Sequence, residues 1–291
     1  MSWLRILHET TYRYKEPVRF GTHRLVLRPR EGHDLRVEEM RLEITPEFEL
    51  EWSRDVFGNS VATVNFLSAG DLLKIRSQVL VHQTAPFPQR PRRHVAPVPF
   101  PVEFSPTESV VAEAYRKSTY PDDVGSVQDW VAANVETAEI QDARQVVIAV
   151  GAAVRKNVKY QRREAKGVQS PGETVALSSG SCRDMATLML EALRCLGLPA
   201  RFASGYLDCM ASEAGRASTH AWAEAYLPEI GWTGYDPTVG EPTSGKHVVT
   251  GVSNHPRGVM PVSGTYFHKT DVFVGMTVAV RTKRLQRKPR S

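Results

Sequence analysis

The residue with the clearest chemical potential in this chain is Cys182, which opens a strongly periodic apolar segment. Apolar side chains recur every three or four positions over residues 185–196, which predicts a helix. Ser181 and Asp184 have the S-x-x-D spacing of a capping box, so Cys182 would occupy the first helical position. A helix N-terminus favours negative charge, and Arg183 adds positive charge nearby, although Asp184 acts against it. Because the thiolate is the nucleophilic form of cysteine, this placement indicates a nucleophile.

The cysteines, at positions 182, 195 and 209, differ in what their surroundings predict. Their odd, low count argues against a disulfide scaffold, and the spacing of the first two is not that of a zinc or redox motif. Cys195 lies inside the apolar segment, where a cysteine packs as a small hydrophobe. Packing is also the alternative for Cys182, but a first-turn position that follows Gly180 and Ser181 is usually accessible.

A histidine and an aspartate stand on a predicted β-hairpin further along the chain. A strictly alternating strand at residues 219–227 carries His220, and a return strand after a Pro-Glu-Ile-Gly turn ends at Asp236. A turn centred on residue 228 would pair these two side chains directly. A later turn centre would offset them by about three residues, a gap that a bulge or the twist of the sheet could close.

Together these three residues have the types needed for acyl transfer on an amide substrate. His220 would take the thiol proton of Cys182 and later deliver it to the leaving amine, while Asp236 would orient the imidazole and stabilise its cation. Taken alone, His220 could be a surface histidine on an edge strand, and Asp236 could merely open an Asp-Pro-Thr turn. Because all three occur in this order, we predict Cys182, His220 and Asp236 as the catalytic residues.

The elements that must position these residues divide into a strand-rich part and a helical part. Alternation with a period near two predicts a β-sandwich-like domain from strands at residues 37–44, 61–66 and 73–79. Prolines, which lack an amide donor and fix φ, then form an extended connector at positions 86, 88, 91, 97, 99, 101 and 106. We predict an N-terminal β-rich domain with its connector over residues 1–100 and a catalytic domain over residues 101–291.

Helical periodicity begins after the connector, and alternation returns near the end of the chain. Three helices are predicted before the cysteine, at residues 107–117, 126–135 and 143–158. Residues 270–280 alternate again and are predicted to form a final strand.

Separated sequence blocks in this order resemble the bacterial transglutaminase-like superfamily. The blocks are Gly-Ser-Cys-Arg-Asp at residues 180–184, a Leu-Gly-Leu-Pro-Ala-Arg segment within residues 193–206, His-Ala-Trp at 220–222, and Gly-Trp with Tyr-Asp-Pro-Thr within 231–238. The N-terminal region resembles the β-rich domain that precedes this core in bacterial members, through Tyr-Arg-Tyr at 12–14, Leu-Arg-Pro-Arg at 27–30 and Asp55 with Phe-Gly-Asn at 57–59.

The resemblance implies an α+β, papain-like fold in which the cysteine heads a helix packed on an antiparallel sheet. It also implies Cys182 as nucleophile, His220 as base and Asp236 as the orienting residue. Family members include transglutaminases, cysteine proteases, peptide deglycosylases and inactive relatives. Bacterial members often carry an acidic, glycine-led motif after the Asp-Pro-Thr block, whereas residues 251–258 are Gly-Val-Ser-Asn-His-Pro-Arg-Gly. The specificity of this protein would differ if that motif shapes the substrate cleft.

We therefore predict a cysteine peptidase or amidase that acts on a protein or peptide without a cofactor. Hydrolysis is favoured over cross-linking, because cross-linking requires an amine to outcompete water at the acyl-enzyme, and no dense acidic loop suggests an activating calcium site. A transglutaminase is one alternative. A non-catalytic binding module on this scaffold is another, as is a zinc site built from Cys182, His220 and a carboxylate.

Several further residues are candidates for supporting roles. The backbone amide of Cys182 is the expected oxyanion donor, and the side-chain donor is left open among Tyr160, Gln161 and Gln169. Trp222 and Trp232 could line a cleft, although aromatic residues on a half-buried sheet are more often part of the core.

Composition limits the partners that we expect. The chain has 291 residues and a net charge of +5, with basic clusters at residues 90–94 and 281–290. No aromatic residues interleave these charges as nucleic-acid stacking would require, so we expect solvated segments and no nucleic-acid partner. No apolar run approaches the roughly 18 residues of a membrane span, and the first residues lack a secretory pattern. We expect a cytoplasmic protein with no membrane partner, and the oligomeric state stays open.

Overall fold

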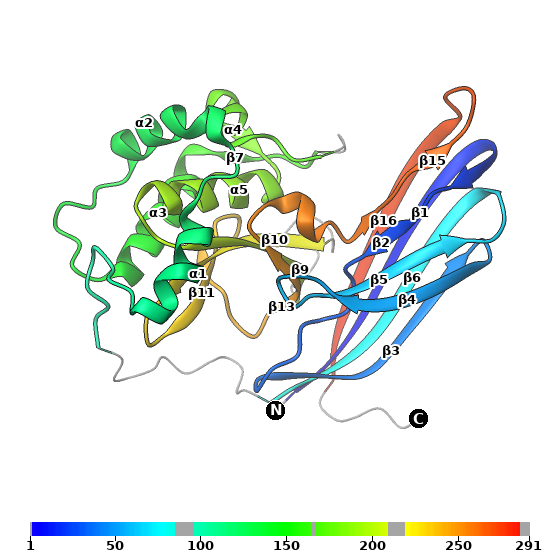
Figure 1. The fold of residues 1–291 in the computed structure, drawn as a ribbon, viewed down its shortest axis with the longest axis horizontal. Coiled ribbons are helices and arrows are strands. Elements are labelled where there is room, and N and C mark those ends of the chain that lie inside the picture. Colours follow the sequence, from blue (N-terminus) through cyan, green and yellow to red (C-terminus); the bar gives the residue numbers. More distant parts are fainter. Residues whose placement is uncertain (1, 85–95, 164–166, 209–218, 286–291) are drawn as a thin grey trace.

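The computed structural model describes residues 2–84, 96–163, 167–208 and 219–285, and it divides into an all-β part and a mixed α and β part (Figure 1). The predicted α+β class is confirmed, with a helix-borne cysteine packed on an antiparallel sheet and preceded by a β-rich part. Some predictions lie outside the described residues. These concern Cys209, the basic run at 90–94, the prolines at 86, 88 and 91, and the basic tail from residue 286 onward.

The N-terminal part is a sandwich of two antiparallel sheets. One sheet contains β1 (Ser2–Phe20), β6 (Gly70–Gln83) and β3 (Leu35–Thr45). The other contains β2 (His23–Leu25), β5 (Ser60–Phe66) and β4 (Phe48–Arg54). Alternate side chains of both sheets point inward and form one buried apolar cluster, which includes Tyr14, Leu25, Val64 and Ile75. We call this part the N-terminal sandwich.

The end of the chain returns to the N-terminal sandwich. β14 (Val262–Ser263) pairs with β2, and β15 (Tyr266–Phe267) pairs with the end of β1. β16 (Phe273–Leu285), which contains most of the predicted final strand, pairs antiparallel with β1 from Trp3 to Tyr14. The division at residue 100 stays a prediction, and these pairings tie the last strands of the chain to its first.

The helices of the C-terminal core, which we define as residues 106–259, include all the predicted ones and several short helices that were not predicted. α1 (Pro106–Arg116), α2 (Val124–Asn134) and α3 (Ala143–Asn157) lie at the predicted positions, and the short helix η1 (Pro121–Asp123) precedes α2. α4 (Pro171–Leu177) was not predicted, although Ser170 and Glu173 form a capping box around Pro171. α4 leads to β8 (Ser179–Gly180), which pairs in parallel with β7 (Lys159–Tyr160).

α5 (Cys182–Cys195) packs on an antiparallel sheet of five strands in the order β12-β11-β10-β9-β13 (Figure 1). Ala221, Ala223 and Ala225 of β10 share a buried cluster with Leu188 and Met189 of α5, so the alanine face of this strand is the face that meets the helix. The strands are β9 (Ala200–Leu207), β10 (Thr219–Leu227), β11 (Gly231–Asp236), β12 (Glu241–Pro242) and β13 (His247–Ser253), and η2 (Pro256–Val259) follows.

The N-terminal sandwich covers the open edge of β13. The Arg30 backbone N–H donates to the carbonyl of Val249 at 2.8 Å. The buried side-chain amide of Asn59 donates to the carbonyl of Val252 at 2.8 Å and accepts from its N–H at 2.9 Å, as a neighbouring strand would. Unpaired backbone groups at a sheet edge are costly when buried, so these contacts complete the edge.

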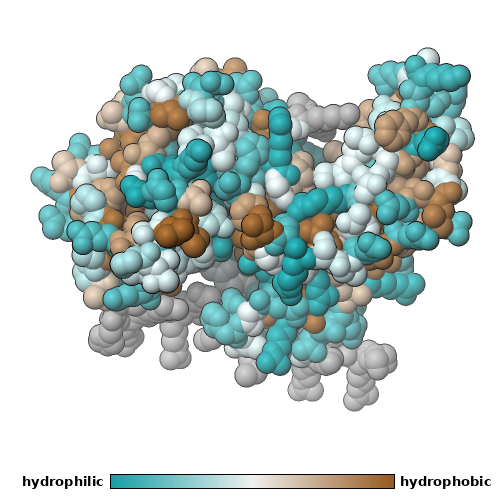
Figure 2. Space-filling view, in the orientation of Figure 1, coloured by the Kyte–Doolittle hydropathy of each residue, from teal (hydrophilic) through white to brown (hydrophobic). Residues whose placement is uncertain are grey.

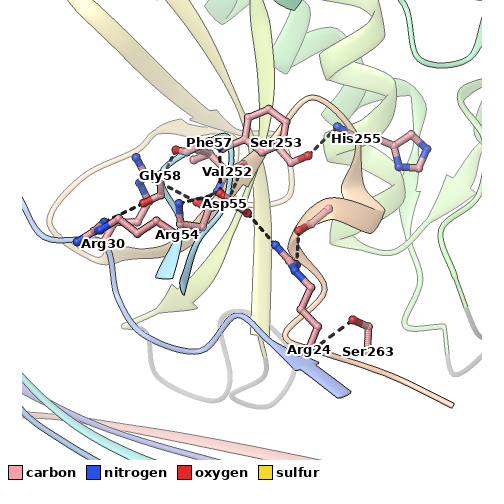
Figure 3. Close-up of polar contacts among 12 residues, drawn as sticks. Arg24, Arg30, Arg54, Asp55, Phe57, Gly58, Val252, Ser253, His255 and Ser263 are labelled. Carbon is pink, nitrogen blue, oxygen red and sulfur yellow. Dashed lines mark hydrogen bonds and ion pairs between the residues drawn. The ribbon is translucent and has the colours of Figure 1, made fainter. Parts of the chain in front are cut away.

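A partly buried carboxylate, that of Asp55, shapes the loop that presents Asn59 (Figure 3). Asp55 accepts from the backbone N–H groups of Phe57 and Asn59 and from the Asn59 amide, and its second oxygen also accepts from Arg24 at 2.7 Å. Arg24 in turn donates to the carbonyl of Gly258 in the C-terminal core. The Asp-x-Phe-Gly-Asn segment therefore joins the two parts of the molecule.

The visible surface is mixed in character. On the face shown in Figure 2, hydrophobic residues form small separate patches among hydrophilic ones. Among the helices of the described residues, none is both long and apolar enough to cross a membrane.

Asn59→Ala should lower the free energy of unfolding by about 2–3 kcal/mol, because it leaves a buried backbone N–H and a buried carbonyl of β13 without partners. Asn65→Ala is the matched control: Asn65 accepts a hydrogen bond from Thr22 at an exposed position, and its loss should cost under about 0.5 kcal/mol. Urea denaturation of both variants measures the difference. Equal losses for the two would contradict the role assigned to Asn59.

Candidate active site

Cys182 lies at the first helical position of α5, as its sequence context predicts. The Asp184 carboxylate reaches back and accepts from the backbone N–H and the hydroxyl of Ser181, both at 2.8 Å. Cys182 is 9% exposed and carries a free thiol. Cys195, also free, is half-buried against the apolar core, as expected for a packing residue. Cys182 therefore lies at the start of a capped helix, as predicted, but it is buried, whereas its first-turn position led us to expect an accessible residue.

Asp184 does not stand as an isolated negative charge beside Cys182. Its buried carboxylate also accepts from Arg163 Nη1 at 3.1 Å and from the Gln169 backbone N–H at 2.8 Å. The guanidinium of Arg163 offsets the charge that was expected to oppose a thiolate. The same contacts tie the loop before α4 to the start of α5.

The hairpin that carries the histidine and the aspartate closes with a three-residue turn, because Leu227 pairs with Gly231. In this register Asp236, which follows Tyr235, lies opposite Trp222, since Tyr235 pairs with Ala223. His220 is therefore a diagonal neighbour of Asp236, at a separation that long side chains span. No bulge between the two strands is needed to bring them together.

His220 lies between the two other predicted residues. Its Nε2 is 2.5 Å from Asp236 Oδ2, and the ring also hydrogen-bonds the Cys182 thiol. Burial alone would lower the pKa of His220, but the hydrogen bonds to Asp236 and Cys182 raise it to about 10. With Nε2 engaged by the carboxylate, Nδ1 is the nitrogen left to face sulfur. The structure thus brings all three predicted side chains together.

Asp236 has a turn-forming oxygen and a histidine-binding oxygen. Oδ1 accepts from the backbone N–H groups of Thr238 at 2.9 Å and Val239 at 3.2 Å, so the residue does open the Asp-Pro-Thr turn. Oδ2 accepts from His220 and also from His247 at 3.1 Å. Burial would raise the pKa of Asp236, but hydrogen bonds from His220 and then His247 hold it below its usual range.

His247 is the residue of this cluster that sequence reasoning missed. It opens β13, a strand that was not predicted, and its side chain is 5% exposed. The β-branched residues in His-Val-Val-Thr-Gly-Val-Ser favour a strand, but no spacing rule links residue 247 to residue 236. The contact depends on how separate strands are arranged in the sheet.

The supporting candidates have different surroundings. Burial and then the charge of Cys182 raise the pKa of Tyr160, which is partly exposed on β7 near the cysteine. The side-chain oxygen of Gln169 accepts from the Thr174 hydroxyl, and the backbone N–H of Gln161 bonds the carbonyl of Gly180. In the described residues, His, Cys, Asp and Glu side chains form no group of three or more that could hold a metal ion.

The two tryptophans differ in their exposure. Trp222 is fully buried in a cluster with Ala203 and Val252, which is a core position. Trp232 is only partly buried, and the guanidinium carbon of Arg201 lies 3.9 Å from its ring centroid.

Comparisons with known proteins match both parts of the chain. Residues 4–82 match the bacterial transglutaminase-like N-terminal region, and residues 118–237 match the transglutaminase-like superfamily. An uncharacterised protein of Mycobacterium leprae is 26% identical over 90% of this chain and 92% of its own length. A protein-glutamine gamma-glutamyltransferase of Pseudomonas aeruginosa is 39% identical over 66 residues, which span 21% of this chain and 10% of that protein.

A solved structure shares the whole architecture. It comes from Cytophaga hutchinsonii and is provisionally described as a cysteine protease. The two chains superpose with a TM-score of 0.74 at 18% identity, over 99% of this chain and 93% of that one. The sandwich and the core therefore occur together in another protein with the same fold.

The contact with Asp236 should keep the His220 ring cationic through neutral pH, with a titration midpoint near pH 10. This contact stabilises the fold fully below about pH 6.5, which is the pKa of a histidine in the unfolded chain. The stabilisation is lost as the pH rises through the pKa of His220 in the folded protein. In Asp236→Asn the midpoint should fall, because the hydrogen bond and the charge of Asp236 are lost while the burial that lowers the pKa of His220 remains. NMR titration of the ring resonances tests this. Asp208→Asn, which removes a carboxylate that pairs with Arg284, should leave the midpoint unchanged. A wild-type midpoint near 6.5 would contradict the assignment.

Proposed function

Because this chain belongs to the transglutaminase-like superfamily, we propose that it is a cysteine-dependent enzyme that transfers acyl groups from amide bonds. One observation carries the proposal: His220 contacts both the Cys182 thiol and the Asp236 carboxylate. In this assignment Cys182 is the nucleophile, His220 the general acid and base, and Asp236 the residue that orients the imidazole. The substrate is a protein or a peptide.

In the proposed reaction the Cys182 thiolate attacks the carbonyl carbon of the amide. The His220 imidazolium delivers its proton to the departing nitrogen as the C–N bond breaks, which leaves a thioester on Cys182 and releases an amine. His220 then takes a proton from the incoming water as its oxygen attacks the thioester. A carboxylic acid leaves, and the thiolate and imidazolium are restored.

The oxyanion of each tetrahedral intermediate needs hydrogen-bond donors. The Cys182 backbone N–H belongs to the first turn of α5, whose amides have no partner within the helix. The Tyr160 hydroxyl is the side-chain donor that we favour among the sequence candidates, because this residue lies within electrostatic reach of Cys182.

We propose hydrolysis rather than cross-linking as the fate of the thioester. Cross-linking requires a sheltered channel in which an amine outcompetes water. The alternative, an amine-accepting transglutaminase, is supported by the named activity of the Pseudomonas aeruginosa relative, which matches this chain over the short segment reported above. The cytoplasmic location stays a prediction from sequence.

Cys182→Ala should abolish labelling by a thiol-directed acylating probe, because it removes the nucleophile that His220 activates. Cys195→Ala is the matched control and should be labelled at the wild-type rate, since burial and then the charge of Glu191 raise the pKa of that thiol and disfavour its reactive thiolate. Peptide mapping by mass spectrometry locates the adduct. Undiminished labelling of Cys182→Ala would exclude the assignment.

The fate of the thioester can be read from its products. An acyl-enzyme trapped on Cys182 from a peptide library identifies the acyl donor. When that donor is then incubated with the enzyme and an excess of a primary amine, hydrolysis predicts a free carboxylic acid as the main product. An amide with the added amine as the main product would instead establish the transglutaminase alternative.

A further inference from the structure

A fourth side chain, His247, reaches the candidate active site from the edge strand β13. Its strand, β13, is separated from β11 by β9 and β10. Its Nε2 nevertheless lies 3.1 Å from Asp236 Oδ2, the oxygen that also binds His220. Asp236 is fully buried, so every donor to its carboxylate replaces a lost water contact.

The hydrogen bonds of His247 define its protonation. The backbone N–H of Ser244 donates to His247 Nδ1 at 3.2 Å, which requires a lone pair on that nitrogen. The ring proton therefore sits on Nε2 and points to Asp236. A neutral ring of this tautomer donates a hydrogen bond without adding charge, so the negative charge of Asp236 stays available to the His220 cation.

The position of the His247 ring is fixed by close packing over the sheet. The ring meets Trp222 edge to face, with centroids 5.0 Å apart and an interplanar angle of 74°. Gly205 makes this approach possible, because a Cβ there would lie 2.0 Å from the Val248 carbonyl oxygen and 3.0 Å from the Trp222 ring. His247 thus has little freedom to turn away from Asp236.

The N-terminal sandwich holds the segment that carries His247. Gln83 at the end of β6 donates to the carbonyl of Gly245 at 2.6 Å. Val248 packs in a buried cluster with Leu4 and Val81 of the sandwich. The placement of His247 therefore depends on both parts of the molecule.

We propose that His247 is a positioning residue for the reaction: a neutral donor, held by the N-terminal sandwich, that fixes the Asp236 carboxylate against His220. This inference rests on the proposed function and extends it. Among the described residues, the titratable groups that face Asp236 are His220 from β10, His247 from β13 and Tyr235, which precedes Asp236 on β11. Loss of the His247 donor leaves the buried carboxylate easier to protonate, and a protonated Asp236 no longer supports the imidazolium that pairs with the thiolate.

Two amide substitutions separate positioning from general structural support. In His247→Gln the side-chain nitrogen can occupy the place of Nε2 and donate to Asp236. His247→Asn has the same chemistry but is one methylene shorter, so its amide falls short of the carboxylate. Both remove the ring contact with Trp222, so a purely structural role would affect them equally.

The measurement is the rate of Cys182 alkylation by iodoacetamide as a function of pH. His247→Asn should move the acid limb of this profile upward by about one pH unit, so that labelling on that limb is about tenfold slower than in wild type. His247→Gln should keep the wild-type limb. His268→Asn is the control, because His268 lies near a carboxylate, Glu16, in the N-terminal sandwich. It should also keep the wild-type limb.

Each outcome decides the question. A shift in His247→Asn alone supports the proposal. The proposal is overturned if the acid limb lies at the same pH in His247→Gln and His247→Asn, whether or not that pH differs from wild type. If both are shifted equally, circular dichroism shows whether the cause is loss of fold. A wild-type protein that is not labelled on Cys182 at any pH would instead overturn the proposed function, so the two failures are distinguishable.

Discussion

The candidate site depends on one buried charge, the carboxylate of Asp236. An ionised group away from water must be fully hydrogen-bonded to be tolerated. Both oxygens of Asp236 meet this requirement, one through two backbone N–H groups of the following turn and the other through His220 and His247. The same bonds that make the charge tolerable also orient His220 toward Cys182, so stability and candidate chemistry share one set of contacts.

The two histidine donors to this carboxylate come from different strands, β10 and β13. The placement of β13 involves the N-terminal sandwich as well as the C-terminal core. β13 carries His247 and is an edge strand of the core, and an edge needs a partner. The N-terminal sandwich supplies that partner through Arg30 and Asn59. The sandwich is therefore part of the framework of the site, although none of its residues touches Cys182, His220 or Asp236 in the contacts described above.

A second buried carboxylate organises the cysteine side of the site. Asp184 closes the start of α5 onto Ser181 and also holds the loop before α4 through Arg163 and Gln169. Its charge is offset by Arg163. The two sides of the site thus follow the same principle, in which a buried acid is surrounded by donors from separate segments and brings those segments together.

The sequence by itself predicted the helix after Cys182, the hairpin and the three side chains of the candidate site, but not α4 or β13. Periodicity, caps and turn residues are local, so they defined the helix after Cys182 and the hairpin that ends at Asp236. It left the hairpin register open, because the turn centre differed by only a residue or two between the choices. Only the tertiary structure decided that Asp236 is a diagonal neighbour of His220, that Arg163 pairs with Asp184, and that His247 completes the cluster. These contacts join residues that share no sequence periodicity, and they form because a buried charge draws donors from strands that folding brings together.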